Sequence, residues 1–306
     1  LCAVFILLLE SGLLLIVPIG GRLFLRGSIS ASAFLLFAYI GSLYLTELLP
    51  LQQLAGNFAQ AFSGITKAKE IFGIPIFEGG DDFPEKYDIE LKDVRFSYDG
   101  KTNVLENCCL YIRDGEKVAV VGASGAGKST IAALIARFYD VDCGEVMIGG
   151  KNVKNIRYET LLQNISIVFQ KTFLTQDSVF DNICMGTNAS LTQVREAASK
   201  AQIDDFIMSL SDGYDTKVGS YGSRFSGGEK QRVAVARALV NKPAVILADE
   251  PSGSLDSKNK AELHQLFFDL RDKFGQTFVI VTHDEGLAAI TDRTIHMKDG
   301  EILGDE

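Results

Sequence analysis

The most informative stretch of this chain is Gly122-Ala-Ser-Gly-Ala-Gly-Lys-Ser129. It follows Val118–Val121, a short apolar run typical of a buried strand. It leads into a helical pattern that carries Ile131, Leu134 and Ile135. A glycine-rich turn between a strand and a helix N-terminus is the setting of a phosphate-binding loop. The alternative is a glycine-rich turn without function, and the flanking pattern favours the phosphate-binding loop.

Each residue type in this loop suits a phosphate ligand. Glycines let backbone N–H groups converge on phosphate oxygens without a clash from a Cβ atom. The helix N-terminus adds about half a positive charge at the same place. We expect Lys128 to reach the β- and γ-phosphates and Ser129 to offer its hydroxyl to Mg²⁺. The expected phosphate-binding residues are Gly122, Ser124, Gly125, Gly127, Lys128, Ser129 and Thr130.

A pair of carboxylates follows a second apolar run. Residues 244–248 read AVILA, and Asp249 and Glu250 come directly after them. In a parallel sheet such residues lie at the carboxyl edge, where ligands bind. We therefore expect Asp249 to hold Mg²⁺ through water and Glu250 to act as the general base toward an attacking water. A solvated strand end is the alternative for the pair taken alone.

A second helix N-terminus resembles an anion site. Ser226-Gly-Gly-Glu-Lys230 precedes a helical pattern, with Ser226 as the expected N-cap. The two glycines, Gly227 and Gly228, would expose N–H groups to a second phosphate. A capped helix with no ligand is the alternative.

The N-terminal part of the chain predicts two membrane helices. Residues 1–20 are apolar except for Glu10 and Ser11, and residues 33–55 form a weaker second candidate. Glu10 would cost about 2.5–3.5 kcal/mol at the centre of a bilayer, so it should face other helices or a cavity. A buried core helix is the alternative for residues 1–20. Residues 56–73 have helical spacing and would continue the second helix into the cytosol.

The rest of the chain predicts a linker and an α/β domain. Residues 74–88 are acidic and rich in proline and glycine, which is typical of a linker. From residue 89 to residue 306, short β-branched runs alternate with helical patterns, which predicts a parallel sheet covered by helices. The expected strands are Lys117–Val121, Ser166–Phe169, Ala244–Ala248 and Thr277–Val281, and helices are expected after Lys128, Gly228 and Asp256.

Composition excludes several function classes. The 306 residues carry a net charge of −9, which argues against a nucleic-acid partner held through its phosphates. Five cysteines show no CxxC pair, so a zinc site or a disulfide framework is not expected and a reducing cytosol fits. The chain begins with Leu1 inside an apolar run without a basic flank, so we expect a chain that starts within a longer protein rather than a signal peptide.

Five segments in fixed order resemble the nucleotide-binding domain of ATP-binding-cassette (ABC) transporters. They are Gly122–Ser129, Gln170, Ser226–Lys230, Ala248–Glu250 and Thr282–Asp284. The resemblance implies an α/β P-loop NTPase of ABC type, with a mixed sheet and a helical subdomain, that binds ATP and Mg²⁺. It also implies that two such domains pair head to tail and enclose two ATP molecules.

The same resemblance implies further roles for single residues. Tyr98 would stack on adenine, although an ordinary strand aromatic is its alternative. Gln170 would link Mg²⁺ and the attacking water to the membrane domain. His283 would bond the γ-phosphate, with a core histidine as the alternative. Ser226, Gly227 and Gly228 would contact the partner's ATP, and Asp256 lies in the loop that crosses to the partner's site. The expected catalytic residues are Lys128, Gln170, Glu250 and His283, and the expected metal ligands are Ser129, Gln170 and Asp249.

The order of apolar segments, linker and ATPase domain resembles the exporter branch of the family. The branch implies a partial all-α transmembrane domain over residues 1–73, holding the last two of six helices. The implied protein lies in the inner or plasma membrane with a cytoplasmic ATPase domain. Its partners would be a second ABC subunit, identical or not, membrane lipid and an unknown transported lipid, drug or peptide.

Several residues depart from the exporter pattern. Phe225 stands where leucine is usual, Glu229 replaces the usual glutamine, and Ser220 replaces a glutamate that senses the coupling helices. From about Arg224 onward the sequence looks more like the lipoprotein-release ATPases, so we hypothesise a join between residues 223 and 235. The main prediction is an ABC exporter subunit. The alternatives are a lipoprotein-release ATPase subunit, or a truncated or chimeric remnant without transport activity, and DNA-repair or translation-type ABC ATPases rank last.

Overall fold

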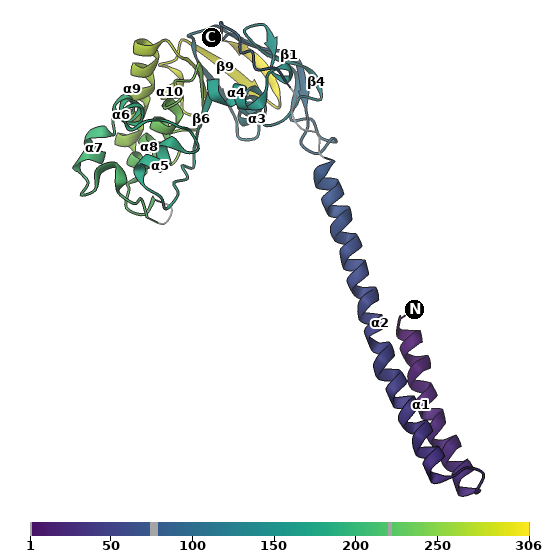
Figure 1. Cartoon of the computed structure of the whole chain (residues 1–306). Coiled ribbons are helices and arrows are strands. Elements are labelled where there is room, and N and C mark those ends of the chain that lie inside the picture. Colours follow the sequence, from purple (N-terminus) through teal and green to yellow (C-terminus); the bar gives the residue numbers. More distant parts are fainter. Residues whose placement is uncertain (1, 74–78, 220–221, 306) are drawn as a thin grey trace. The chain divides into compact units, whose positions relative to one another are not determined.

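The computed structural model describes the backbone of residues 2–73, 79–219 and 222–305 (Figure 1). Two compact units make up the chain, Leu1–Ile76 and Phe77–Glu306. Ser220, one of the departures from the exporter pattern, lies outside the described residues.

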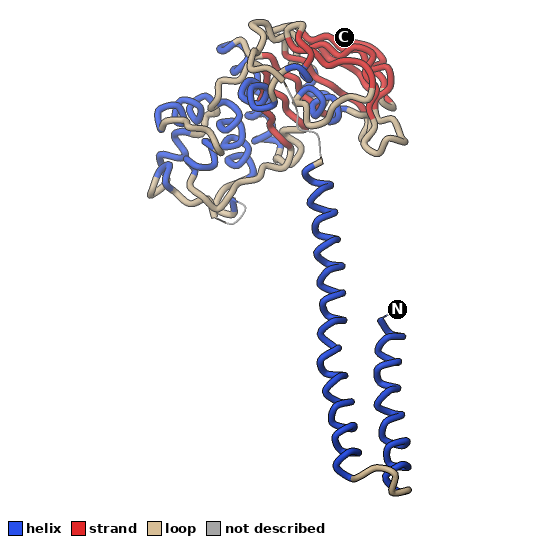
Figure 2. The backbone as a smooth tube through the Cα atoms, turned by 45° about the vertical axis from the view of Figure 1, so that its right-hand side comes forward, coloured by secondary structure: helices blue, strands red, loops and turns tan. Residues whose placement is uncertain are grey.

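Two helices form the first unit. They are α1, Cys2–Leu25, and α2, Ala31–Phe72, and they lie side by side in Figures 1 and 2. α2 runs without a break over 42 residues, through both of the segments for which the sequence predicts helix. The hydroxyl of Ser30 accepts a hydrogen bond from the Ala33 N–H at 3.2 Å and so begins α2 as its N-cap.

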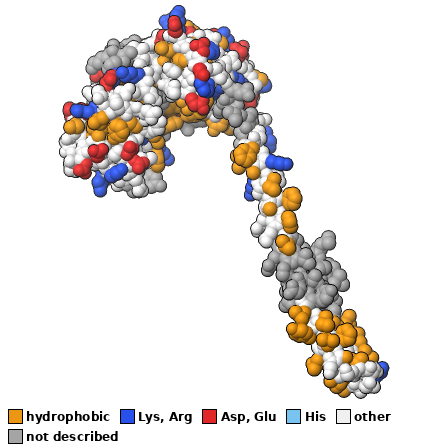
Figure 3. Space-filling model, in the orientation of Figure 1, with side chains coloured by type: hydrophobic (Ala, Val, Ile, Leu, Met, Phe, Trp, Pro, Cys, Tyr) orange, Lys and Arg blue, Asp and Glu red, His pale blue; other side chains and the backbone are white. Residues whose placement is uncertain are grey.

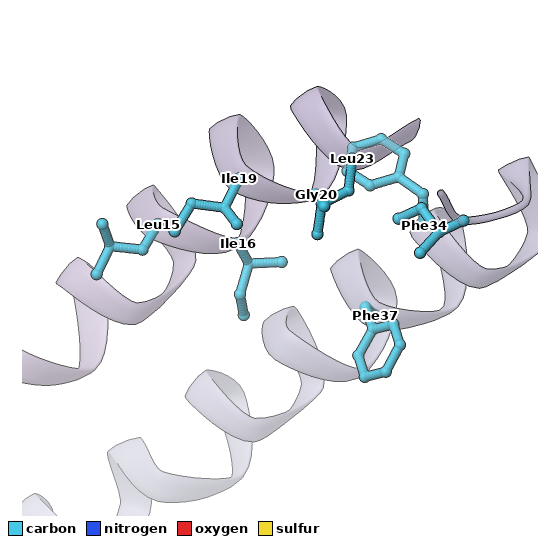
Figure 4. A pocket seen from close by; sticks show the side chains of 8 residues that line it. Leu15, Ile16, Ile19, Gly20, Leu23, Phe34 and Phe37 are labelled. Carbon is cyan, nitrogen blue, oxygen red and sulfur yellow. The ribbon is translucent and has the colours of Figure 1, made fainter. Parts of the chain in front are cut away.

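A small residue allows the two helices to approach each other. A Cβ atom added to Gly20 would lie 2.8 Å from the Phe34 ring, which is closer than real Cβ contacts. Phe24 stacks on the same ring, with centroids 6.2 Å apart. Beside this contact lies an apolar groove of about 280 Å³, shown in Figure 4. Its lining residues are Leu15, Ile16, Ile19, Gly20, Leu23, Ile29, Phe34 and Phe37.

Apolar side chains cover much of the described surface of this unit (Figure 3). Within the described residues, no helix has both the length and the apolar character needed to cross a bilayer. The large exposed side chains include Leu14, Leu25, Leu35, Leu36, Phe37, Phe62 and Phe72. Contiguous apolar surface of this kind is unusual on a soluble monomer and marks an interaction surface.

A six-stranded sheet forms the centre of the second unit. Its order is β10-β9-β3-β8-β7-β6, and all neighbouring pairs are parallel except β10 with β9. The sheet is therefore mixed, as the family resemblance implies. The strands are β3 Lys117–Gly122, β6 Ile165–Phe169, β7 Val245–Asp249, β8 Thr277–Thr282, β9 Arg293–Lys298 and β10 Glu301–Asp305. The four strands predicted from the sequence are confirmed to within one residue at each end.

A second, antiparallel sheet belongs to the same unit. Its order is β2-β1-β4-β5, and its strands are β1 Ile89–Phe96, β2 Leu105–Ile112, β4 Cys143–Ile148 and β5 Lys151–Asn152. Its buried residues share one hydrophobic cluster with β3 and with α3, Lys128–Ile135. This cluster fixes the strand and the helix on either side of the predicted phosphate loop.

A group of helices surrounds a second hydrophobic cluster. The helices of this group are α5 Val179–Cys184, α6 Leu191–Lys200, α7 Asp204–Ser209 and α8 Gly227–Leu239. Because α8 also packs on β6, the group is joined to the sheet through this helix. α9, Ser257–Phe274, contributes Leu263, Leu266, Phe267 and Leu270 to the same cluster. The remaining helices are α4 Tyr158–Asn164 and α10 Glu285–Ala288, with single 3₁₀ turns at Val153–Asn155 and Gly213–Asp215.

The acidic segment before β1 is attached to the second unit. Lys151 pairs with the Asp82 carboxylate at 3.5 Å, and Arg157 pairs with Asp81. Phe83 and Tyr87 pack against the hydrophobic cluster that contains β3 and α3. The described part of this segment is therefore held in place by contacts and not only by its two ends.

Candidate functional site

The phosphate loop lies between the end of β3 and the start of α3. Gly127 is the N-cap of α3 with φ of 95°, and Gly125 has φ of 83°, a left-handed region that glycine enters without strain. Ser124 is exposed, whereas Thr130 is buried on α3. The backbone therefore has the shape expected for a loop that encloses phosphate oxygens.

Lys128 lies inside this loop. Its ammonium donates hydrogen bonds to the carbonyl oxygens of Gly122 and Ala123, both at 2.9 Å, and the residue is only 6% exposed. A positive charge with no carboxylate among these contacts suits an anionic ligand, because a phosphate would supply the compensating charge. The loop thus holds its own cation at the place where a phosphate would lie.

Ser129 and Asp249 meet across the sheet. The Ser129 hydroxyl donates to Oδ1 of Asp249 at 2.8 Å, because β8 alone separates β3 from β7 in the sheet order. Burial raises the pKa of Asp249, and the hydrogen bond from Ser129 opposes this rise. Within the described residues, no group of three His, Cys, Asp or Glu side chains could hold a metal. Mg²⁺ does not need one, because it commonly takes one or two protein oxygens together with substrate phosphates and water.

Glu250 and His283 form a second pair at the same edge. His283 Nδ1 lies 3.1 Å from Glu250 Oε1, and the side chains are 65% and 26% exposed. Glu250 has φ of 46°, and its N–H donates to the Val281 carbonyl at 2.8 Å. The carboxylate is therefore accessible to solvent and to a ligand, and it lies one residue beyond Asp249.

Tyr98 lies next to the helix that follows the phosphate loop. Its hydroxyl lies 3.1 Å from Thr130 Oγ1, and its ring is 55% exposed. Tyr139 meets the Tyr98 ring edge to face, with centroids 5.1 Å apart. An exposed, oriented aromatic face beside a phosphate loop is suited to stacking on a base. Sequence reasoning missed Tyr139, because its contact with Tyr98 depends on the turn after α3.

The residues at Ser226–Gly228 form a closed cap on α8. The Ser226 hydroxyl accepts from the Glu229 N–H at 3.3 Å, and Glu229 Oε2 accepts from the Ser226 N–H at 2.7 Å. This is a capping box, so Glu229 has a clear local role. Phe225, the other departure in this motif, is buried against Phe206 with ring centroids 5.5 Å apart. In the described part of the chain, no hydrogen bond joins Ser226–Gly228 to the phosphate loop.

Asp256 connects this cap to α9. Its carboxylate accepts from the N–H groups of Lys258 and Asn259 at 3.1 and 2.9 Å, and these bonds hold its pKa below the ordinary value. Asn259 also donates to Asp256 at 2.7 Å, and its Oδ1 would lie 2.3 Å from a Cβ added to Gly228. Sequence reasoning missed Asn259, although its place three residues after Asp256 is typical of a capping partner.

Gln170 lies beside the turn that follows Glu250. A Cβ added to Gly253 would lie 2.6 Å from Gln170 Nε2, and Ser254 donates to the Gln170 carbonyl at 3.4 Å. Gln231 of α8 donates to the Phe169 carbonyl at 3.2 Å and accepts a hydrogen bond from Thr172. The buried Gln231 side chain therefore bonds to residues on both sides of Gln170 in the sequence. Sequence reasoning missed this contact.

Comparison with known proteins agrees with this geometry. Residues 105–253 match the family model described as ABC transporter. The chain is 48% identical over 221 residues to the lipoprotein-releasing system ATP-binding protein LolD of Bacteroides fragilis, which covers 70% of this chain and all of that protein. It is 35% identical over 301 residues to the ATP-dependent lipid A-core flippase of Syntrophus aciditrophicus, which covers 95% of this chain and 49% of the flippase.

A solved structure is similar over both units. The structure of a bacterial Atm1-family ABC exporter with ATP bound gives a TM-score of 0.72 at 32% identity, over 88% of this chain and 48% of the exporter chain. The chain therefore spans about half the length of the exporters it resembles. The chain belongs to the ABC transporter family, binds and hydrolyses ATP, and resembles the exporters of this family over both units.

Proposed function

We propose that this ATPase drives outward movement of a lipid, drug or peptide across the inner or plasma membrane, with its ATPase unit in the cytoplasm. One observation carries the proposal. The flippase match covers 95% of the chain, so it includes residues of the helical unit, whereas the LolD match covers 70%. The apolar run over residues 1–20 and the exposed apolar side chains of α1 and α2 support a place in the membrane. The protein would be multi-pass through these two helices.

The chemistry proposed for the site is in-line attack of water on the γ-phosphate. Lys128 would hold the β- and γ-phosphates with a charge that already lies inside the loop. Glu250 would accept the proton of the attacking water, because its carboxylate is partly exposed at the sheet edge. His283 would form a hydrogen bond with the γ-phosphate. Its contact with Glu250, at 3.1 Å, would hold the Glu250 and His283 side chains in place relative to each other. Tyr98 would carry the adenine.

The metal proposed for this site is Mg²⁺. Ser129 and Asp249 fit it, because a hydroxyl and a carboxylate oxygen 2.8 Å apart are both hard ligands. Gln170 would join them from the other side of the turn after Glu250. When bound, Mg²⁺ supplies positive charge against the phosphate oxygens. Asp249 and Ser129 would hold the ion, and its binding would replace their mutual hydrogen bond.

We also propose that the working unit is a dimer, of like or unlike subunits. Ser226, Gly227 and Gly228 lie at the start of α8, and the described residues bring no phosphate-loop group to them. A second subunit would supply the ATP that they contact, and Asp256 would face the same partner. The phosphate loop and the N-terminus of α8 in one subunit would then have separate roles.

A lipoprotein-release subunit is the second candidate. The 221 matched residues exceed the 83 residues from 224 to 306 (306 − 223 = 83), so the LolD likeness also includes residues before the hypothesised join. In that case the chain would work with a separate membrane protein.

Membrane extraction separates the two candidates. Membranes that contain the full chain are washed with alkaline carbonate, and a variant lacking residues 1–73 serves as the matched control. The exporter proposal predicts that the full chain stays in the pellet and that the control is released. Release of both forms, with ATPase activity retained, would favour the lipoprotein-release candidate.

A further inference from the structure

One face of α9 contacts the turns of both Glu250 and His283. Lys260 and His264 lie four residues apart on this helix, so they share a face one turn apart. His264 Nε2 lies 3.0 Å from Ser252 Oγ, and the two residues are only 8% and 4% exposed. Lys260 forms an ion pair with Asp284. Ser252 is two residues after Glu250, and Asp284 directly follows His283.

The Glu250 turn needs support from outside itself. Its φ of 46° is unusual for a residue with a Cβ, and such backbone persists only where the surrounding structure holds it. The Gly253 N–H donates to the Glu250 carbonyl at 3.0 Å and closes the turn. His264 adds the buried hydrogen bond to Ser252 within this turn. The bond therefore restrains the backbone that carries the Glu250 carboxylate.

The His283 turn is held in a similar way. Asp284 caps α10 by accepting from the N–H groups of Gly286 and Leu287 at 2.8 and 3.2 Å. Its other carboxylate oxygen pairs with Lys260, and Asp284 is mostly buried. The position of His283 therefore depends on a carboxylate that α9 holds from one side and α10 from the other.

We propose that Lys260 and His264 are positioning residues for ATP hydrolysis. His264 acts through Ser252 on Glu250, and Lys260 acts through Asp284 on His283. Because both belong to one rigid helix, α9 sets the 3.1 Å separation between the Glu250 carboxylate and the His283 imidazole. The inference rests on the role proposed above for Glu250. It assigns a function to His264, which the sequence placed in no motif.

The test compares two substitutions of His264 in the full chain. Gln places a nitrogen near the position of the imidazole Nε2, so His264→Gln keeps the hydrogen bond, whereas His264→Leu keeps the bulk and loses it. We expect His264→Leu to lower kcat about 10- to 100-fold with little change in the KM for ATP. His264→Gln should restore kcat to within about threefold of the parent. Lys260→Met should lower kcat in the same way.

A matched control separates positioning from general destabilisation. Leu270→Ala removes a buried side chain farther along α9 and should lower the Tm without a comparable loss of kcat. Two results would overturn the proposal. One is an unchanged kcat in His264→Leu, and the other is an equal loss of kcat in Leu270→Ala at an equal loss of Tm.

A double variant distinguishes failure of this inference from failure of the role of Glu250. If His264 acts through Glu250, adding His264→Leu to Glu250→Gln should cause no further loss of residual hydrolysis. A full additional loss would show that His264 acts elsewhere. Parental hydrolysis by Glu250→Gln alone would remove Glu250 from its proposed role, and α9 would then position no base.

Discussion

The Ser129 hydroxyl donates a hydrogen bond to Asp249 at 2.8 Å, although 120 residues separate them in sequence. Ser129 lies in the first turn of α3, and Asp249 is the last residue of β7. β8 lies between β3 and β7 in the sheet, and α3, which follows β3, packs on both β8 and β7, so Ser129 reaches Asp249 at the carboxyl edge. This single bond brings the phosphate loop and the carboxylates into one site.

Ser129→Ala should weaken Mg²⁺-dependent ATP binding more than ATP binding in EDTA. The substitution removes a ligand proposed for the metal, and it leaves the loop backbone and Lys128 in place. We expect the affinity for Mg²⁺-ATP to fall about 10-fold, the scale of one hydrogen bond to a charged group. Titration of a fluorescent ATP analogue with and without Mg²⁺ measures this difference, and equal losses under both conditions would contradict the assignment.

Lys128→Ala should abolish tight ATP use. The ammonium lies inside the loop on the Gly122 and Ala123 carbonyls, and no other cation contacts that position among the described residues. We expect ATP affinity to fall about 10- to 100-fold and hydrolysis to be lost. Lys242→Ala, an exposed lysine on the opposite end of the sheet strands, is the matched control and should bind ATP like the parent.

Glu250→Gln should bind ATP and fail to hydrolyse it. Loss of a general base lowers the rate about 10²- to 10⁴-fold, while the amide keeps the shape of the side chain. Because ATP is not consumed, the variant should accumulate as an ATP-bound dimer. Size-exclusion chromatography with light scattering, with and without ATP, measures the dimer, and a monomer at saturating ATP would count against the dimer proposal.

Gly228→Ala should block dimer formation without harming the phosphate loop. An added Cβ would lie 2.3 Å from Asn259 Oδ1, so Asn259 must move and the cap on α8 must change. We expect parental ATP affinity but no ATP-dependent dimer in the Glu250→Gln background. Gly304→Ala, whose added Cβ meets no atom within 4 Å, should leave the dimer intact.

His264 should make the ATPase unit less stable in acid. Burial lowers the pKa of its imidazole, Lys260 lowers it further, and Asp284 opposes both. The unfolded chain therefore binds more protons at this site below about pH 6.5, so stability is complete above that pH and falls as the pH falls through the folded pKa. Thermal melts from about pH 7.5 to about pH 5 should show a smaller loss of Tm for His264→Gln than for the parent. An equal loss in both proteins would assign the acid sensitivity to other groups.

Local sequence was sufficient for the ends of the central strands and for the loop between β3 and α3. Apolar runs that end in glycine or in Asp249 and Glu250 fix those boundaries, because a buried strand needs a continuous apolar stretch. The contact of the Tyr98 hydroxyl with Thr130 of the phosphate-loop helix was not predicted, because the sequence suggested only a stacking role for Tyr98. The strand ends and this loop could be predicted because they depend on residues that are adjacent in the sequence and on the order of the motifs.

Local sequence did not predict the contacts between residues that are far apart in the chain. Asn259 contacts Gly228, and Gln231 spans Phe169 and Thr172, because separate helices converge on one sheet edge. No local pattern specifies such convergence, since Asn and Gln occur on many helix surfaces. His264 was similarly invisible, because its importance comes from burial against Ser252. The sequence predicted α2 as two adjoining segments, residues 33–55 and 56–73, which the structure joins into one helix.

The hydrogen bonds of Gln231 limit which segments of this protein can be exchanged with those of a relative. Its side chain, 2% exposed, ties the helix that begins at Gly227 to Phe169 and Thr172, which lie about sixty positions earlier in the sequence. A chimaera that takes only one of these two segments from a relative must find another partner for a buried amide. Recombination or design that exchanges parts of this protein should therefore take the segment with Phe169 and Thr172 and the helix with Gln231 from the same source. The two segments form one structural module, although they are separate in the gene.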